Sequence, residues 1–272
     1  MRTGCLLVLC IARLASAQDA SAVMLRLHPR VGDTLHTQLE QRTDVTMTTP
    51  RGVMPARSVT TSVGIHSRTI VRSVQAASTT VLTIVDSAVL SSTDVHAAAQ
   101  VADAQRALRG QQLILQLGAD GTVESARDAQ GNLIPRELAD AMAAMPAVFP
   151  RRAVSVGDRW VREMPLPSGG PLGARGSAHV RATFHLDSLL RGGAIAYVSM
   201  RGEILPDSAS HGVELSGSIT GDMQLDRVRG WMTDSRILVF LKSVVSPPSA
   251  SGLAPMQFIT RVTQRLTTIG AH

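Results

Sequence analysis

Cysteine is scarce in this chain, since Cys5 and Cys10 are the only two among its 272 residues. Both fall within residues 1–17, where a basic residue, a short apolar run and a small-x-small pattern predict a secretory signal peptide cut before Gln18. The predicted mature chain therefore has no thiol, no disulfide and no cysteine metal site. We expect an exported protein, either periplasmic or secreted, without a transmembrane segment.

An exported chain without disulfides depends on its hydrophobic core for stability. The roughly 255 residues that remain are enough to form one. We expect a single β-rich domain over 18–272, and we leave open a division into two similar halves, 18–149 and 150–272.

Lysine is almost absent, with Lys242 as the only one. A phosphate-binding loop needs a Gly-Lys-Ser/Thr segment before a helix, and Lys242 lies in an apolar strand pattern instead. The formal net charge of +6 falls to +4 once Arg2 and Arg13 are removed. The remaining arginines are scattered, which favours compositional bias over a nucleic-acid surface.

Aromatic residues make up only 3% of the chain. Their scarcity argues against stacking platforms for nucleic acid or sugar, and against the aromatic girdles of a transmembrane barrel. Trp160 and Trp231 each follow a turn, where core packing or capping of a sheet edge is the favoured role. His179 and His185 share one face of a strand but are about 20 Å apart at ~3.3 Å per residue, too far to share one ion.

No serine has the setting of a nucleophile elbow, and no histidine pair has metal-ligand spacing. We therefore predict no catalytic residues, no cofactor, no metal and no enzymatic activity.

The richest signal is strict alternation along 213–225, where odd positions are apolar or glycine and even positions are polar. A period of two predicts a half-buried strand. Asp226–Gly230 then predicts a turn, Trp231–Val245 a second long strand and Met256–Ile269 a third. Together they predict an antiparallel meander.

Further strands are predicted along the rest of the chain, with two helices between them. The expected strands are Val23–Leu27, Leu35–Thr48, Ser58–Ser73, Thr79–Leu90, Gln112–Leu117, Thr122–Ala126, Ser177–Leu186 and Ala194–Ile204. Asp120-Gly121 marks a tight hairpin. Asp94 and Gly110 bracket an alanine-rich helix, and Pro135–Met145 has the pattern of a second one. The fold class is mainly β, a curved antiparallel sheet or half-barrel with one or two short helices packed on it.

Two short segments repeat, Val31-Gly32-Asp33 and Val156-Gly157-Asp158, and each precedes a strand, a Pro/Gly loop and a hairpin. This order is the basis for the two halves.

The chain resembles a family of uncharacterised exported bacterial domains of unknown function in these two segments and in further short pieces. The further pieces are Leu25-Arg26-Leu27, Pro150 and Arg159-Trp160 on either side of the second segment, and Gly221–Asp226 followed by Gly230. The resemblance implies an antiparallel β fold similar to the half-barrels of periplasmic lipoprotein carriers. Many members are lipid-anchored, whereas this chain lacks a good anchoring cysteine. The family implies no catalytic residues.

Ten methionines remain after cleavage, and methionine suits adaptable apolar surfaces. Met142 and Met145 on the second predicted helix, with Met200 and Met223 on strands, are candidates to line a lipid-sized cavity, although ordinary core packing is the stronger expectation. Two functions stay open. One is a non-enzymatic protein that binds a lipid or another apolar small molecule in a curved sheet. The other is a structural or interaction protein that contacts envelope proteins through sheet edges or loops such as Pro165–Gly176.

Overall fold

Eleven antiparallel strands form one sheet in the computed structural model, which describes residues 22–49, 55–134, 148–166, 178–206, 213–246 and 255–271. The strands are β1 (Thr34–Thr48), β2 (Arg57–Val74), β3 (Ser78–Ser92), β4 (Gln112–Gly118), β5 (Val123–Asp128), β6 (Arg159–Leu166), β7 (Ala178–Leu190), β8 (Ile195–Pro206), β9 (Val213–Asp226), β10 (Trp231–Val245) and β11 (Met256–Ala271). A 3₁₀ turn, η2 (Val95–Ala97), leads into the helix α1 (Ala98–Leu108).

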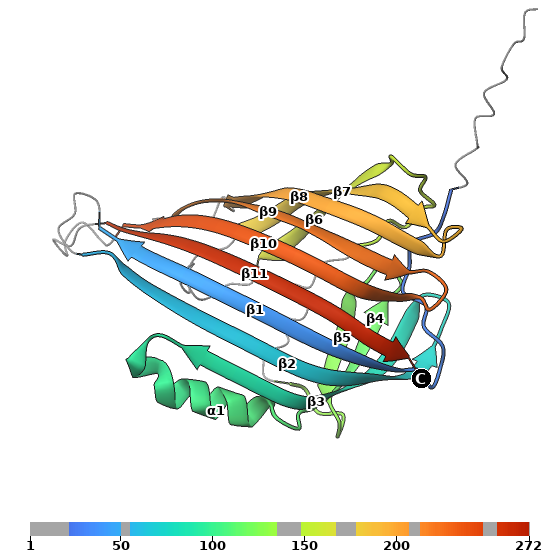
Figure 1. Cartoon of the computed structure of the whole chain (residues 1–272), viewed down its shortest axis with the longest axis horizontal. Coiled ribbons are helices and arrows are strands. Elements are labelled where there is room, and N and C mark those ends of the chain that lie inside the picture. Colours follow the sequence, from blue (N-terminus) through green and yellow to red (C-terminus); the bar gives the residue numbers. More distant parts are fainter. Residues whose placement is uncertain are drawn as a thin grey trace, which may run out of the picture.

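The sheet order is β5-β4-β3-β2-β1-β11-β10-β9-β8-β7-β6. Strands that follow one another along the chain are neighbours, except that β1 pairs with β11 and that β5 and β6 form the two opposite edges. Figure 1 shows β1 and β11 at the front, with β4, β5 and β6 behind them. The sheet is therefore strongly curved but not closed, which confirms the predicted curved antiparallel sheet.

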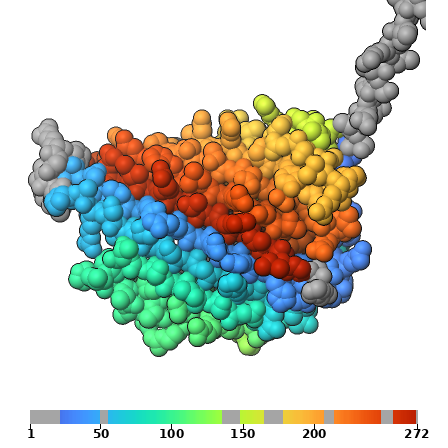
Figure 2. Space-filling model, viewed as in Figure 1, coloured from blue at the N-terminus to red at the C-terminus, as the bar shows by residue number. Residues whose placement is uncertain are grey.

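The alternation along β9 is confirmed. Leu215, Met223 and Leu225 are buried, whereas Ser216 and Asp222 between them are exposed. The neighbouring strands follow the same rule because antiparallel partners share a face. Along β9 the concave face is thus more buried than the convex face, and Figure 2 shows the convex face of the sheet with β11 in red between β1 in blue and β10 in orange.

The predicted hairpins and the first helix are also confirmed. β4 and β5 flank the Asp120-Gly121 turn, and α1 lies between Asp94 and Gly110 as expected. The Asp94 carboxylate accepts a hydrogen bond from the backbone N–H of His96 at 3.1 Å. The helix packs against β3, where the Gln105 side-chain oxygen accepts the Leu90 N–H at 2.9 Å. The second predicted helix, 135–145, lies outside the described residues, as does the predicted signal peptide.

The two Val-Gly-Asp segments form the same turn. Gly32 and Gly157 have φ of 90° and 95°, a region that glycine enters without strain. Gly32 N–H donates to the carbonyl of Val71 at 3.0 Å, and Gly157 N–H donates to that of Leu186 at 2.8 Å. The first turn thus holds the start of β1 beside β2, and the second holds the start of β6 beside β7. The division of the chain into two halves remains a prediction.

The prediction of a strand over Val23–Leu27 is wrong. Residues 22–28 run across the concave side as a strap that bonds in turn to three different parts of the chain, so no continuous ladder forms. Val23 pairs with Val154, Leu27 N–H donates to Ala119 O at 2.9 Å, and His28 N–H donates to Gly230 O at 2.8 Å.

The strap completes the main core. Leu25 is 1% exposed and packs in a cluster with side chains of β6 to β10 and with Phe149 and Val154. Val154 and Phe149 belong to the connection that leads from edge strand β5 to edge strand β6. The concave face over β6 and β7 is therefore covered by chain.

Candidate ligand-binding site

A single row of residues crosses the concave face of the sheet from β3 to β6. Consecutive members are register partners on neighbouring strands, so all of their side chains share one face. The row is Leu90, Val63, Gln41, Gln264, Ile237, Gly221, Met200, Phe184 and Trp160.

The β6 end of the row is aromatic and closed. The rings of Trp160 and Phe184 stack with centroids 5.7 Å apart, and Trp160 Nε1 donates to Val148 O at 2.8 Å. Phe184 is fully buried beneath the cover formed by the strap and the β5–β6 connection. The expected core role of Trp160 is confirmed.

The middle of the row is open. A cavity of about 1110 Å³ is lined by residues of seven neighbouring strands, from β3 to β8. Strands that far apart in the sheet order can border one space only on the concave side. The volume is slightly above the range for small-molecule sites, roughly 300–1,000 Å³.

Two kinds of side chain point into this cavity. Ile237 and Met200 give it an apolar wall on β10 and β8, and Val63 adds to it on β2. Gln41 and Gln264, which are partners on β1 and β11, bring two amides to its centre. Both glutamines are half-buried, and Gln41 Nε2 makes a long hydrogen bond of 3.4 Å to Thr43 Oγ1.

Glycine creates part of the space. A Cβ at Gly221 would lie 2.5 Å from the carbonyl oxygen of Arg236, and a Cβ at Gly217 would lie 2.3 Å from that of Phe240. These close backbone approaches between β9 and β10 leave no room for a side chain on the concave face. The close approach of β9 to β10 therefore depends on glycine, and Gly221 also leaves space beside Met200, whose Cε would lie 3.4 Å from a Cβ there.

The charged residues that border the cavity belong to the opposite face by alternation. Glu40 is the strand register partner of Arg265, and Asp222 is that of Arg236, and all four side chains are on the convex side. The only charged concave side chain on β6 is Arg162, and its guanidinium is bound by the carbonyl of Phe149 and by Asp120. The part of the cavity wall that the structure describes is thus lined by uncharged side chains.

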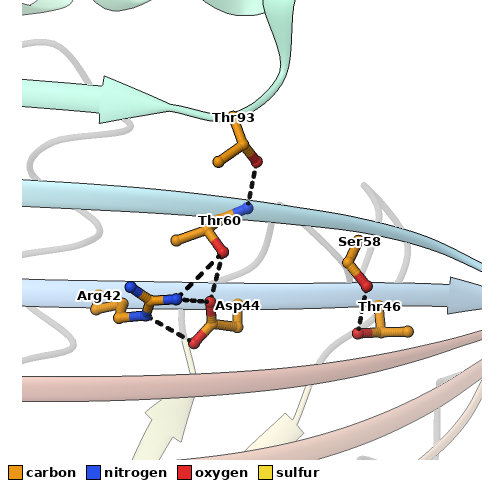
Figure 3. A network of polar contacts seen from close by, with 6 residues as sticks. All are labelled: Arg42, Asp44, Thr46, Ser58, Thr60 and Thr93. Carbon is orange, nitrogen blue, oxygen red and sulfur yellow. Dashed lines mark hydrogen bonds and ion pairs between the residues drawn. The ribbon is translucent and has the colours of Figure 1, made fainter.

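The convex face has its own polar network, centred on Asp44 (Figure 3). Arg42 donates two hydrogen bonds to the Asp44 carboxylate, at 3.0 and 2.9 Å, and Thr60 Oγ1 donates a third at 2.6 Å. The hydrogen bonds from Arg42 and then from Thr60 lower the pKa of Asp44. This network joins β1 to β2 and faces away from the cavity, so we assign it to strand pairing.

Ion pairs span the seam between the two ends of the sheet, with β6 on one side and the β4–β5 turn on the other. Arg162 on edge strand β6 has its Nη2 3.9 Å from Asp120 Oδ2 in the β4–β5 turn, and Arg151 Nε is 3.5 Å from the same oxygen. The Asp120 side chain is only 11% exposed. Burial alone would raise its pKa, but hydrogen bonds from Thr122 and Arg151 outweigh burial, so the pKa lies below its usual value.

The predicted ligand-lining methionines separate into three groups. Met200 lines the cavity. Met223 is 3% exposed in the main core and is not among the described residues that border the cavity. Met142 and Met145 lie outside the described residues, and so does most of the predicted interaction loop, of which Pro165 and Leu166 end β6.

Sequence reasoning missed the glutamine pair. The only sequence signal for the pair is position along the strand: Gln41 and Gln264 are each two residues from an apolar concave residue, Leu39 and Leu266, and so face the same side.

Within the described ranges, no group of three histidine, cysteine, aspartate or glutamate residues is placed to hold a metal ion. In the same ranges, no helix combines the length and the apolar character that a membrane crossing needs.

No protein-family model and no curated protein matches this chain. Three solved structures are similar to it over most of its length. They are the outer membrane protein OprG from Pseudomonas aeruginosa (8% identity, 90% of this chain and 99% of that one, TM-score 0.21), DynF from the dynemicin pathway of Micromonospora chersina (10%, 92% and 86%, 0.23) and an outer membrane channel from Pseudomonas putida F1 (10%, 93% and 98%, 0.23). At such TM-scores the likeness carries no information on the fold or function of this chain.

Proposed function

We propose that this chain is an exported, non-enzymatic binding protein that holds an apolar small molecule or lipid against the concave face of its sheet. The observation that carries the proposal is the cavity of about 1110 Å³ between β3 and β8, with its apolar wall of Val63, Ile237 and Met200. Apolar ligands are bound mainly by such concave, largely apolar surfaces.

The arrangement of the sheet supports the same function. Gly221 on β9 adds no side chain to the cavity, while the stacked Trp160 and Phe184 close its β6 side. A sheet used only for support gains more from a filled interior, because packed apolar side chains stabilise a fold that has no disulfides. Export rests on the signal-peptide pattern of residues 1–17.

The test is a titration of the purified chain with the apolar fluorescent probe N-phenyl-1-naphthylamine. Ile237→Arg places a charge in the cavity wall and should weaken probe binding at least about tenfold, because an unpaired charge is poorly tolerated in an apolar site. Phe240→Arg is the matched control, since Phe240 is also on β10, is 38% exposed, points to the convex face and is not among the described residues that border the cavity. It should bind the probe as the parent chain does.

Circular dichroism and urea unfolding separate loss of the cavity from loss of the fold. If Ile237→Arg does not fold, Val63→Arg on β2 makes the same test from the other side of the cavity. Failure of the parent chain to bind the probe, or equal binding by both Ile237→Arg and Phe240→Arg, would overturn the proposal. N-terminal sequencing of the chain recovered from the exported fraction should begin at Gln18.

A further inference from the structure

We propose that the cavity selects a single-chain lipid whose polar group is uncharged, and that the side-chain amides of Gln41 and Gln264 bind this group. The inference rests on the proposed function and adds the chemical class of the ligand. Its basis is the position of two amides within an otherwise apolar row.

The first step is the geometry of the two glutamines. Gln41 and Gln264 are direct partners on β1 and β11 and both line the cavity. Neighbouring strands lie about 4.8 Å apart, so two long side chains on one face reach the same small volume. The two glutamines therefore form one polar patch.

The second step is hydrogen-bonding capacity. Each glutamine amide offers one acceptor oxygen and two donor hydrogens. The hydrogen bond from Gln41 to Thr43, at 3.4 Å, uses one donor and is long. Polar groups set among apolar side chains are costly unless they are hydrogen-bonded, so the patch suits a ligand with hydroxyl, ester or amide groups.

The third step is charge. The residues that alternation directs into the cavity are uncharged, while its charged neighbours Glu40 and Arg265 are opposite each other on the convex face. A ligand carboxylate or phosphate at the glutamine patch would have no counter-charge within the wall that the structure describes. Losing its hydration without an ionic partner would cost an ionised group far more than it would a neutral one.

The fourth step is the direction of the apolar part. From Gln264 the row continues through Ile237 and Gly221 to Met200, three strand spacings away or about 14 Å along the sheet. This stretch is apolar and free of side chains at Gly221, so it fits a hydrocarbon chain. An amphipathic ligand would thus place its neutral group at β1 and β11 and its chain across β10 to β8.

Two probes with the same hydrocarbon chain test the proposal. 1-Monopalmitoylglycerol and palmitate are compared as competitors of N-phenyl-1-naphthylamine, at a pH where palmitate is ionised. We expect the monoacylglycerol to bind at least about tenfold more tightly than palmitate. In the double variant Gln41→Leu/Gln264→Leu, which keeps similar side-chain size, the preference should fall below about twofold.

Thr267→Val is the matched control, because Thr267 lies three residues from Gln264 on β11, faces the convex side opposite Gln38 and is not among the described residues that border the cavity. It should keep the full preference. If palmitate competes as well as the monoacylglycerol in the parent chain, or if the glutamine double variant keeps the preference, the head-group inference is wrong while ligand binding stands. If neither lipid displaces the probe, the proposed function itself fails.

Discussion

Arg162 and Asp120 link the two free edges of the sheet, with Nη2 of the arginine 3.9 Å from Oδ2 of the aspartate. Arg162 lies on edge strand β6, and Asp120 lies in the turn that joins β4 to edge strand β5. The pair thus spans the seam that an open, curved sheet leaves between its ends. The Asp120 side chain is 11% exposed, so water would hydrate its carboxylate poorly if the ion pair were broken.

Asp120→Asn should lower the free energy of unfolding by about 1–3 kcal/mol, since it removes a charged acceptor from Thr122, Arg151 and Arg162. Urea unfolding followed by circular dichroism measures the change. Asp103→Asn is the control, because the Asp103–Arg106 pair on α1 is largely exposed and should contribute less than about 0.5 kcal/mol. Equal effects of the two variants would show that the seam pair adds no stability.

The seam should also respond to acid. The pKa of Asp120 in the folded chain lies below its usual value, because hydrogen bonds from Thr122 and Arg151 outweigh the effect of burial. Its contribution to stability is therefore fully present above the unfolded pKa of ~3.9 and is lost as pH falls through the lower folded pKa. The stability difference between the parent and Asp120→Asn should shrink between about pH 5 and about pH 2. A difference that stays constant over this range would contradict the assignment.

Gly221→Ala tests whether the close approach of β9 to β10 needs glycine. The added Cβ would lie 2.5 Å from the carbonyl oxygen of Arg236, so β9 and β10 must move apart, and we expect a loss of about 1–3 kcal/mol in urea unfolding. Gly64→Ala is the control on β2. Its Cβ would meet only the carbonyl of Val89, at 4.0 Å, and should change stability by less than about 0.5 kcal/mol.

The sequence carries most of the local structure of this fold. Alternation along β9 was enough to predict its two faces, because the side-chain direction in a strand depends only on parity. Asp120-Gly121 predicted the β4–β5 hairpin for a similarly local reason. Such signals place the strands but do not say which of them pair over long distances.

The candidate site depends on those long-range pairings. Gln41 and Gln264 are neighbours only because β1 pairs with β11, and no local pattern in either strand predicts this pairing. The strap was missed for a related reason: Val23–Leu27 has an apolar strand pattern, but its hydrogen bonds go to three separate turns and connections. The methionine content predicted a ligand-lining role for both Met200 and Met223. Met200 does line the cavity, whereas Met223 packs in the core.

The two Val-Gly-Asp turns make a paired prediction. Gly32 and Gly157 have φ of 90° and 95°, and a Cβ at either would meet no atom within 4 Å. Gly32→Ala and Gly157→Ala should therefore each cost about 1–2 kcal/mol in urea unfolding, through backbone strain alone. Costs that differ by more than about 1 kcal/mol would show that the two turns are not equivalent in energy.

The last prediction concerns the strap. Gly230, in the β9–β10 turn, has φ of 65°, and a Cβ there would lie 2.2 Å from the carbonyl carbon of His28. Gly230→Ala should therefore displace the strap, break the hydrogen bond from His28 N–H to Gly230 O and loosen the neighbouring bond from Leu27 N–H to Ala119 O. Amide hydrogen exchange at Leu27 and His28 should accelerate at least about tenfold.

Gly192→Ala separates the steric clash from backbone strain. Gly192 has nearly the same φ, 64°, but a Cβ there would meet no atom within 4 Å. Both variants carry the backbone penalty of alanine at positive φ, and only Gly230→Ala also pushes against the strap. Faster exchange at Leu27 and His28 in both variants would mean that strain in any turn loosens the strap. Faster exchange in neither would mean that the chain absorbs the clash at Gly230 by shifting the β9–β10 turn instead, with residues 22–28 held firmly by Leu25 in the core.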